Sequence, residues 1–225
     1  MRTLAVVPSY QEEESVGRTV LSLLAIPEVD RVVVIDDCSD DSTPRGAACA
    51  GATVVVNGAN LGKGGSLNRV LPHLEFDILL LIDGDLGDSA RGADKILRPV
   101  LAGEADLVVA AFGSPSRKGG FGVAQGLGRK VIRMLAGREM ASPLSGQRAM
   151  TRRVYGRVAP FERGFGVEVG MTVDALRAGF TVVEVETGMS HRETGRDLAG
   201  FIHRGRQFVD ILRSALRRTP RGGGT

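Results

Sequence analysis

The stretch ILLLIDGDLGD, residues 78–88, joins a run of five aliphatic residues to three acids that follow within six positions. A short, continuous apolar run of this kind is typical of a strand buried on both faces of a sheet. Asp83 and Asp85 then follow that strand, and Gly84 between them lets the backbone turn. Because ligands of open α/β sheets bind outside the carboxyl ends of the strands, the sequence predicts a carboxylate-bearing site there.

The rest of the chain alternates short aliphatic runs with segments of helical period, which is the pattern of one α/β domain with a mostly parallel central sheet flanked by helices. Further strands are expected at residues 3–8, 31–37, 52–57, 105–112 and 180–186. Helices are expected at residues 13–26, from 40–43 onward, and at 62–74, 126–138, 167–178 and 197–218. Residues 143–155 are expected to form a short strand or turn.

Four of the expected strands end in polar or glycine-rich groups: PSYQEEE, DDCSDDST, NGANLGKGG and DGDLGD. A helix cap accounts for residues 40–43 alone, but four such ends together indicate a shared ligand. Asp83 and Asp85 supply hard oxygen ligands for a divalent metal ion, and GKGG offers Lys63 and backbone N–H groups to an anion. A P-loop and a GxGxxG motif after the first strand are both absent, which disfavours an NTPase or a dinucleotide oxidoreductase.

Composition describes an ordinary globular chain of 225 residues, with 43% hydrophobic residues, 24% charged residues and a net charge of +3. No hydrophobic run approaches the roughly 18 residues of a membrane-spanning helix, and no secretory apolar segment follows Met1, so we expect a cytoplasmic location. Cys38 and Cys49 have no metal-ligand or disulfide spacing. With 4% aromatic residues and no recognised module, nucleic acid is not an expected partner.

The motifs VVPSYQEEESV, VVVIDDCSDDST, NLGKGGSLN and LLLIDGDL occur in the order found in family 2 glycosyltransferases, and the chain resembles that family over most of its length. The resemblance implies a GT-A fold and a nucleotide-diphospho-sugar donor, either a UDP- or a GDP-sugar. It implies that the donor contacts are Pro8, Tyr10, Glu12, Asp37, Lys63, Asp83 and Gly84. It also implies that Asp85 is the direct ligand of Mg²⁺ or Mn²⁺ and acts in catalysis through that metal.

The second half of the chain carries a narrower resemblance. SPLSGQRAMTRR, APFERGFGVEVGMTVDALRAGF and VETGMSHRETGRDL are similar to glucosyl-phosphoglycerate synthases, which implies that Glu168 faces the sugar or acceptor and that His191 completes the metal shell. GMSHRETGRDL also resembles polyprenyl-phosphate sugar synthases. Both groups use phosphate-bearing acceptors, so a small phosphate ester and a lipid phosphate stay open as acceptors. Glu168 would orient the acceptor hydroxyl or act as a base.

Basic residues cluster in this half. We expect Arg117, Lys118 and Arg148 to bind the acceptor phosphate, with solvated surface charge as the alternative. The arginine-rich helix expected at 197–218 either packs on the sheet or lies on an anionic membrane face. The expected organisation is a nucleotide-binding half at residues 1–112, an acceptor half at 113–218 and a disordered tail at 219–225. The oligomeric state is open, a homodimer included.

Two other functions remain alternatives. A nucleotide-sugar-binding protein without turnover would keep the same site, although the combination of Lys63, Asp83, Asp85, Glu168 and His191 favours an enzyme. A sugar-phosphate nucleotidyltransferase has a related α/β architecture, but the glycine-rich N-terminal loop with its Arg and Lys expected of such enzymes is missing. The sequence therefore favours a metal-dependent glycosyltransferase.

Overall fold

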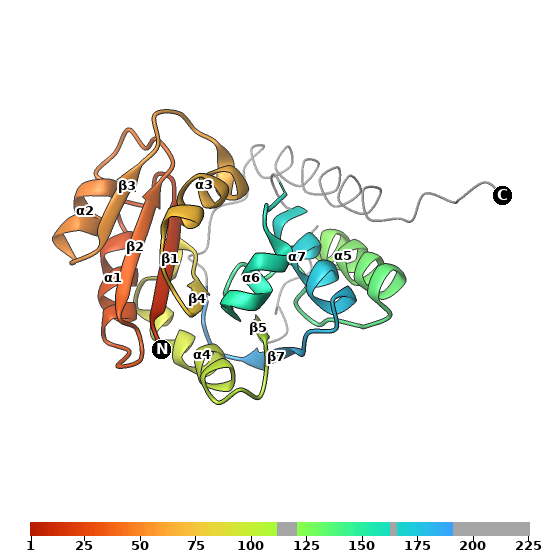
Figure 1. The fold of residues 1–225 in the computed structure, drawn as a ribbon. Coiled ribbons are helices and arrows are strands. Elements are labelled where there is room, and N and C mark those ends of the chain that lie inside the picture. The colour runs from red at the N-terminus through yellow and green to blue at the C-terminus, as the bar shows by residue number, and fades with distance from the viewer. Residues whose placement is uncertain (112–120, 163–165, 191–225) are drawn as a thin grey trace.

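The aliphatic run at residues 78–82 is the centre of the fold. A computed structural model describes residues 1–111, 121–162 and 166–190, and within these ranges seven strands form one sheet in the order β3-β2-β1-β4-β6-β5-β7 (Figure 1). The strands are β1 (Thr3–Ser9), β2 (Arg31–Asp36), β3 (Thr53–Val56), β4 (Ile78–Leu81), β5 (Leu107–Ala111), β6 (Arg148–Thr151) and β7 (Val182–Glu186). All four side chains of β4 are buried, as expected for a strand covered on both faces.

Helices connect most of the strands. They are α1 (Val16–Leu24), α2 (Thr43–Cys49), α3 (Gly62–Val70), α4 (Asp94–Leu101), α5 (Phe121–Ala136), α6 (Arg152–Val158) and α7 (Gly166–Arg177). Two 3-10 helices, η1 (Leu71–His73) and η2 (Gly84–Ala93), complete the described elements. In this part of the chain no helix combines the length and apolar character needed to cross a bilayer.

The sheet separates two hydrophobic cores, because successive side chains of a strand point to opposite faces. Val33 and Leu79 face the core that α3, α5, α6 and α7 cover, whereas Val34 and Leu80 face the core under α1, α2, η2 and α4. The structure therefore confirms the predicted α/β domain with its mostly parallel sheet flanked by helices.

One strand runs against the others. β6 pairs antiparallel with both β4 and β5, whereas β1–β2, β2–β3, β1–β4 and β5–β7 are parallel pairs. The sequence predicted a short strand or turn at residues 143–155. The structure shows that β6 passes directly into α6, where the Thr151 side chain caps the helix by accepting a hydrogen bond from the N–H of Val154 at 3.3 Å.

Candidate active site

The carboxyl ends of β1, β2 and β4 meet at one edge of the sheet, and antiparallel β6 begins at that same edge. The register pairs Leu81 of β4 with Arg148 of β6. Residues just after β4 therefore lie beside residues just before β6. This brings Asp83 next to Gln147, although 64 positions of sequence separate them.

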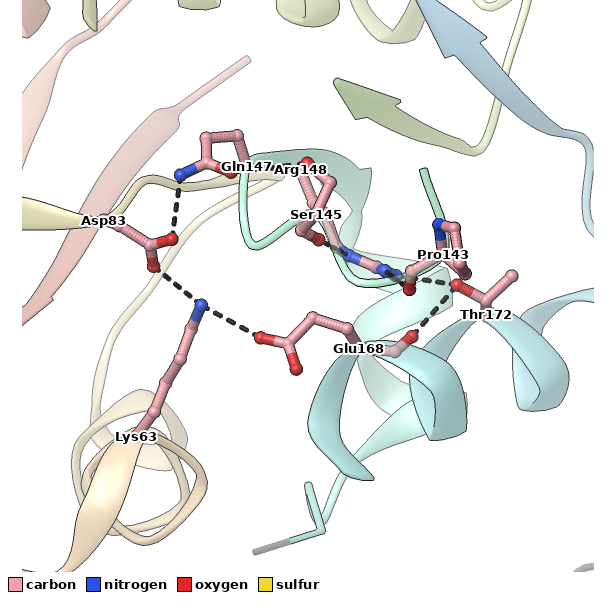
Figure 2. Close-up of polar contacts among 8 residues, drawn as sticks. All are labelled: Lys63, Asp83, Pro143, Ser145, Gln147, Arg148, Glu168 and Thr172. Atoms are coloured by element: carbon pink, nitrogen blue, oxygen red, sulfur yellow. Dashed lines mark hydrogen bonds and ion pairs between the residues drawn. The ribbon is translucent and has the colours of Figure 1, made fainter. Parts of the chain in front are cut away.

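A half-buried lysine joins two carboxylates at this edge. The Lys63 ammonium lies 2.7 Å from Asp83 Oδ1 and 3.0 Å from Glu168 Oε1, as Figure 2 shows. Lys63 belongs to the first turn of α3, Asp83 follows β4 and Glu168 stands in the first turn of α7. The side chain of Glu168 is only 7% exposed, so its pairing with Lys63 compensates for the loss of water.

The charge on Lys63 is secured by these two acids. Burial alone would lower its pKa, because the ammonium loses water, but the attraction of Asp83 and Glu168 outweighs this effect and raises the pKa above its ordinary value. Lys63 is therefore a fixed cation at neutral pH. A fixed cation at the carboxyl ends of parallel strands is suited to an anionic ligand.

The helix that carries Lys63 is docked against the segment that precedes α7. The Asn68 side chain donates to the carbonyl of Phe161 at 2.8 Å and accepts from its N–H at 2.7 Å. A side chain at Gly64 would overlap the carbonyl of Glu162, which explains a glycine here in GKGG. These contacts fix the separation between Lys63 and Glu168.

Asp37 was predicted to contact the donor, and the structure shows its carboxylate bound by groups of the chain itself. Its carboxylate is buried and accepts hydrogen bonds from Asn57 at 2.7 Å, Ser66 at 2.8 Å, the Leu61 N–H at 2.9 Å and the Gly62 N–H at 2.7 Å. Burial would raise the pKa of Asp37, but the four donors together hold it below its usual value. The backbone N–H groups at the start of α3, which we expected to bind an anion, therefore bind the Asp37 carboxylate. This carboxylate orders the loop that leads to Lys63.

Asp83 and Asp85 have different surroundings. Both oxygens of Asp83 accept hydrogen bonds, from Lys63 at 2.7 Å and from the Gln147 amide at 2.8 Å. Asp85 lies in the first turn of η2 with its side chain half-buried, and its carboxylate fits the hard-oxygen chemistry of Mg²⁺ or Mn²⁺. Across the described residues no group of three or more His, Cys, Asp or Glu side chains is arranged to hold a metal ion. A metal beside Asp85 would therefore need other ligands.

The remaining predicted donor contacts surround the end of β1. Pro8 is half-buried in the strand, Tyr10 is 45% exposed and Glu12 is half-buried. The Glu12 N–H donates to Thr43 Oγ1 at 2.7 Å, and its carboxylate accepts from Ser15 at 2.9 Å. Gly84 lies so close to Ser9 that a side chain there would stand 2.6 Å from the hydroxyl. The loop after β1 and the turn after β4 therefore touch.

Arg148, which we expected to bind the acceptor phosphate or to be a solvated surface charge, is not at the surface. Its side chain is fully buried, and its guanidinium donates to the carbonyl of Ser145 at 2.9 Å, to that of Pro143 at 3.4 Å and to the Thr172 hydroxyl at 2.9 Å (Figure 2). The reason is its position in β6, between two other strands. Burial lowers the pKa of Arg148 to about 10, so the group stays cationic at neutral pH.

Several predicted residues lie outside the described ranges. These are Arg117, Lys118, His191, the helix expected at 197–218 and the tail at 219–225. Their predicted roles in acceptor binding, metal binding and membrane contact stay predictions.

Sequence reasoning missed two residues that line the site. Gln147 bonds Asp83, and the backbone at Gly146 approaches so closely that a side chain would overlap the carboxylate of Asp83 and the ammonium of Lys63. The available signal was the group SGQR just before an apolar run, but only recognition of an antiparallel strand would have placed it at this edge.

Solved structures place this fold among the glycosyltransferases. A glucosyl-3-phosphoglycerate synthase from Mycobacterium tuberculosis, in complex with Mn²⁺, UDP and glucosyl-3-phosphoglycerate, superposes with a TM-score of 0.80 at 27% identity, covering 100% of this chain and 83% of that one. The same enzyme was also crystallised with Mg²⁺ and UDP, and that structure gives a TM-score of 0.76 at 26% identity over 95% of this chain and 79% of that one. The chain therefore has the fold of GT-A glycosyltransferases.

Sequence comparison gives the family. The model of glycosyl transferase family 2 matches residues 4–156, and this chain belongs to that family. A glucosyl-3-phosphoglycerate synthase of Mycolicibacterium smegmatis is 34% identical over 238 residues, which cover 95% of this chain and 77% of the relative. An undecaprenyl-phosphate mannosyltransferase of Micrococcus luteus is 31% identical over 237 residues, covering 96% and 95%. The chain is a glycosyltransferase, which sets aside the nucleotidyltransferase alternative.

Proposed function

We propose that this chain transfers a sugar from a UDP-sugar to a phosphate-bearing acceptor with the help of Mg²⁺ or Mn²⁺. The observation that carries the proposal is the Lys63 ammonium held between Asp83 and Glu168 at the carboxyl ends of the strands. The presence of UDP and Mn²⁺ in a structurally similar synthase supports UDP as the nucleotide. The names of the relatives support both a phosphoglycerate and a polyprenyl phosphate as acceptor.

The donor diphosphate would compete with Glu168 for Lys63, while Asp83 keeps the ammonium in place. In the described structure the ammonium is shared between Asp83 and Glu168, and its raised pKa keeps it charged for the incoming anion. Charge develops on the leaving nucleoside diphosphate as the bond to the sugar breaks, and a preorganised cation stabilises that charge. Lys63 therefore binds the leaving group and lowers the barrier to its departure.

Asp85 is the residue that would hold the metal, together with diphosphate oxygens and His191. A bound divalent ion supplies Lewis-acid stabilisation of the leaving diphosphate. The preceding acid has a different task in this proposal. Asp83 accepts hydrogen bonds on both oxygens, and one of them holds Lys63 in place for the diphosphate.

Glu168 is the acceptor-side residue of the proposal. It lies in the first turn of α7, and Lys63 connects it to the donor side at 3.0 Å. Once the diphosphate replaces Glu168 at the Lys63 ammonium, which Asp83 still holds, Glu168 is available to orient an acceptor hydroxyl or to take its proton. A phosphate acceptor, which is already anionic, would need only the orienting role.

The test is a donor and acceptor screen of the purified chain. UDP-glucose, UDP-galactose and GDP-mannose are each incubated with Mn²⁺ or Mg²⁺, first alone and then with 3-phosphoglycerate or undecaprenyl phosphate, and released nucleotide is measured. We expect release from a UDP-sugar that depends on the metal and increases with one of the acceptors. No release with any combination, together with no metal-dependent UDP binding by calorimetry, would contradict the proposal. UDP binding without any release would support the binding protein without turnover.

A further inference from the structure

The loop before β6 brings a neutral side chain to the most crowded part of the site. Gln147 is fully buried, and its amide N–H donates to Asp83 Oδ2 at 2.8 Å while Lys63 occupies Oδ1 at 2.7 Å. The carboxylate of Asp83 is thus held between two donors that come from different elements. Rotation of that carboxylate would break at least one of the two hydrogen bonds.

The orientation of the Gln147 amide is itself determined. The ionised carboxylate of Asp83 can only accept, so the amide nitrogen of Gln147 faces it, and the amide oxygen then accepts from the Ser145 hydroxyl at 3.3 Å. With this orientation the side chain presents a donor, not an acceptor, to the acid. Figure 2 shows the resulting series of contacts, from Ser145 through Gln147, Asp83 and Lys63 to Glu168.

The loop that carries Gln147 is anchored from both sides. The carboxylate of Glu184, on β7, accepts from the N–H groups of Ala141 at 2.7 Å and Ser142 at 2.6 Å. The buried guanidinium of Arg148 donates to the carbonyls of Ser145 and Pro143. A buried loop with this many fixed backbone contacts has one conformation, so it is a rigid support for a side chain that must aim at a neighbour.

We propose that Gln147 is a positioning residue that holds Asp83, and through it Lys63, in the geometry that binds the donor diphosphate. The inference rests on the proposed function, since it concerns the same donor site. Gln147 acts through Asp83 and needs no contact with the substrate. Its neutrality is part of the role, because a carboxylate at this position would repel Asp83 and compete for the ammonium of Lys63.

Three variants give a graded test. Gln147→Met keeps the length and much of the volume but removes the amide, Gln147→Glu adds a charge, and Ser145→Ala removes only the group that orients the amide. The probes are UDP with MnCl₂ by calorimetry and UDP-glucose hydrolysis for the separation of KM and kcat. We expect the UDP Kd and the UDP-glucose KM to rise about tenfold for Gln147→Met, which is the loss typical of a hydrogen bond to a charged group. A larger rise is expected for Gln147→Glu and a smaller one for Ser145→Ala.

The readouts separate the possible outcomes. If Gln147 only fills space, Gln147→Met will change the melting temperature at most, and its KM and UDP Kd will stay within twofold of the wild type; this result would overturn the inference. An equal or smaller effect of Gln147→Glu compared with Gln147→Met would also overturn it, because the added carboxylate should repel Asp83. Failure of the wild-type chain to bind UDP counts against the proposed function and is recognised before any variant is compared.

Discussion

The site has two walls that are built in different ways. The strand-end wall consists of Asp37, Lys63, Asp83 and Asp85, which follow parallel strands or begin the helix after one. The opposite wall consists of Gly146, Gln147 and Glu168, which precede an antiparallel strand or begin a helix. The first wall is fixed mainly by the direction of its strands. The second depends on a pairing between β4 and β6 that joins distant parts of the chain, and only Lys63 touches acids of both walls among the described contacts.

The largest effect is expected at Asp85, the residue of the strand-end wall that we propose as the metal ligand. Asp85→Ala should abolish Mn²⁺-dependent UDP binding and lower kcat/KM by about 100-fold or more, because stabilisation of the leaving group is lost. Asp88→Ala is the matched control. Asp88 is an acid of the same 3-10 helix, and its side chain is 78% exposed and forms a long ion pair with Arg18 at 3.5 Å. Unchanged metal-dependent UDP affinity in Asp85→Ala, measured by calorimetry, would refute the assignment.

Removal of the shared cation should uncouple the two walls. Lys63→Met leaves Asp83 and Glu168 without their common partner and removes the charge that meets the diphosphate, so we expect about a 100-fold loss of kcat/KM. Lys95→Met, at an exposed lysine of α4, is the control and should keep full activity. Initial rates of UDP-sugar turnover measure the activity, and thermal unfolding shows whether each variant is folded. Equal activities of the two variants would show that Lys63 has no catalytic role.

A smaller change tests the closeness of the walls. In Gly146→Ala the new methyl group would overlap the Asp83 carboxylate and the Lys63 ammonium, so the two walls must move apart. We expect about a tenfold weaker binding of UDP, the cost of one charged hydrogen bond. Gly156→Ala is the control, since a methyl group on that exposed position of α6 meets nothing within 4 Å. Calorimetry on both variants tests whether the close contact of the Gly146 backbone with Asp83 and Lys63 affects the affinity for UDP.

The smallest effect on activity is expected at Asp37, whose role we expect to be stability. Asp37→Asn should lower the free energy of unfolding by about 2 kcal/mol at pH 7, because four donors lose a charged acceptor. The pKa of Asp37 is depressed in the folded chain, so its contribution is complete above the unfolded value of about 3.9 and is lost as the pH falls through the folded value. Urea unfolding at pH 7 and pH 3 should show the difference between wild type and variant becoming smaller in acid. If the difference in stability between wild type and variant is the same at pH 7 and pH 3, the effect comes from the shape of the Asp37 side chain and not from its charge.

The strand-end wall could be predicted from sequence because its signals are local. An aliphatic run that ends in Asp83 and Asp85 already determines the burial of the strand and the edge at which the acids appear. The helix after GKGG and the direction of the parallel strands follow from similar patterns. The sequence did not predict one detail: the backbone N–H groups of Leu61 and Gly62, before Lys63, bind Asp37, an anion that belongs to the chain.

The opposite wall could not be derived in this way. Gln147 is an ordinary neutral residue before a four-residue strand, and no local pattern reveals that the strand is antiparallel or that β4 is its neighbour. Arg148 was assigned to the acceptor phosphate, with solvated surface charge as the alternative, and its complete burial was not foreseen, because arginine is seldom fully buried. Glu168 was identified only through the resemblance of its surrounding motif. Long-range pairing, and not residue chemistry, was the missing information.

The docking of α3 on the segment before α7 has a consequence for protein engineering. The Asn68 amide exchanges two hydrogen bonds with the backbone of Phe161, and Gly64 leaves room for the carbonyl of Glu162. A chimera that takes its C-terminal half from a relative would have a foreign backbone at this contact. Grafts should therefore transplant Gly64 and Asn68 together with residues 159–162, so that the two halves of the chain can be recombined without losing their alignment.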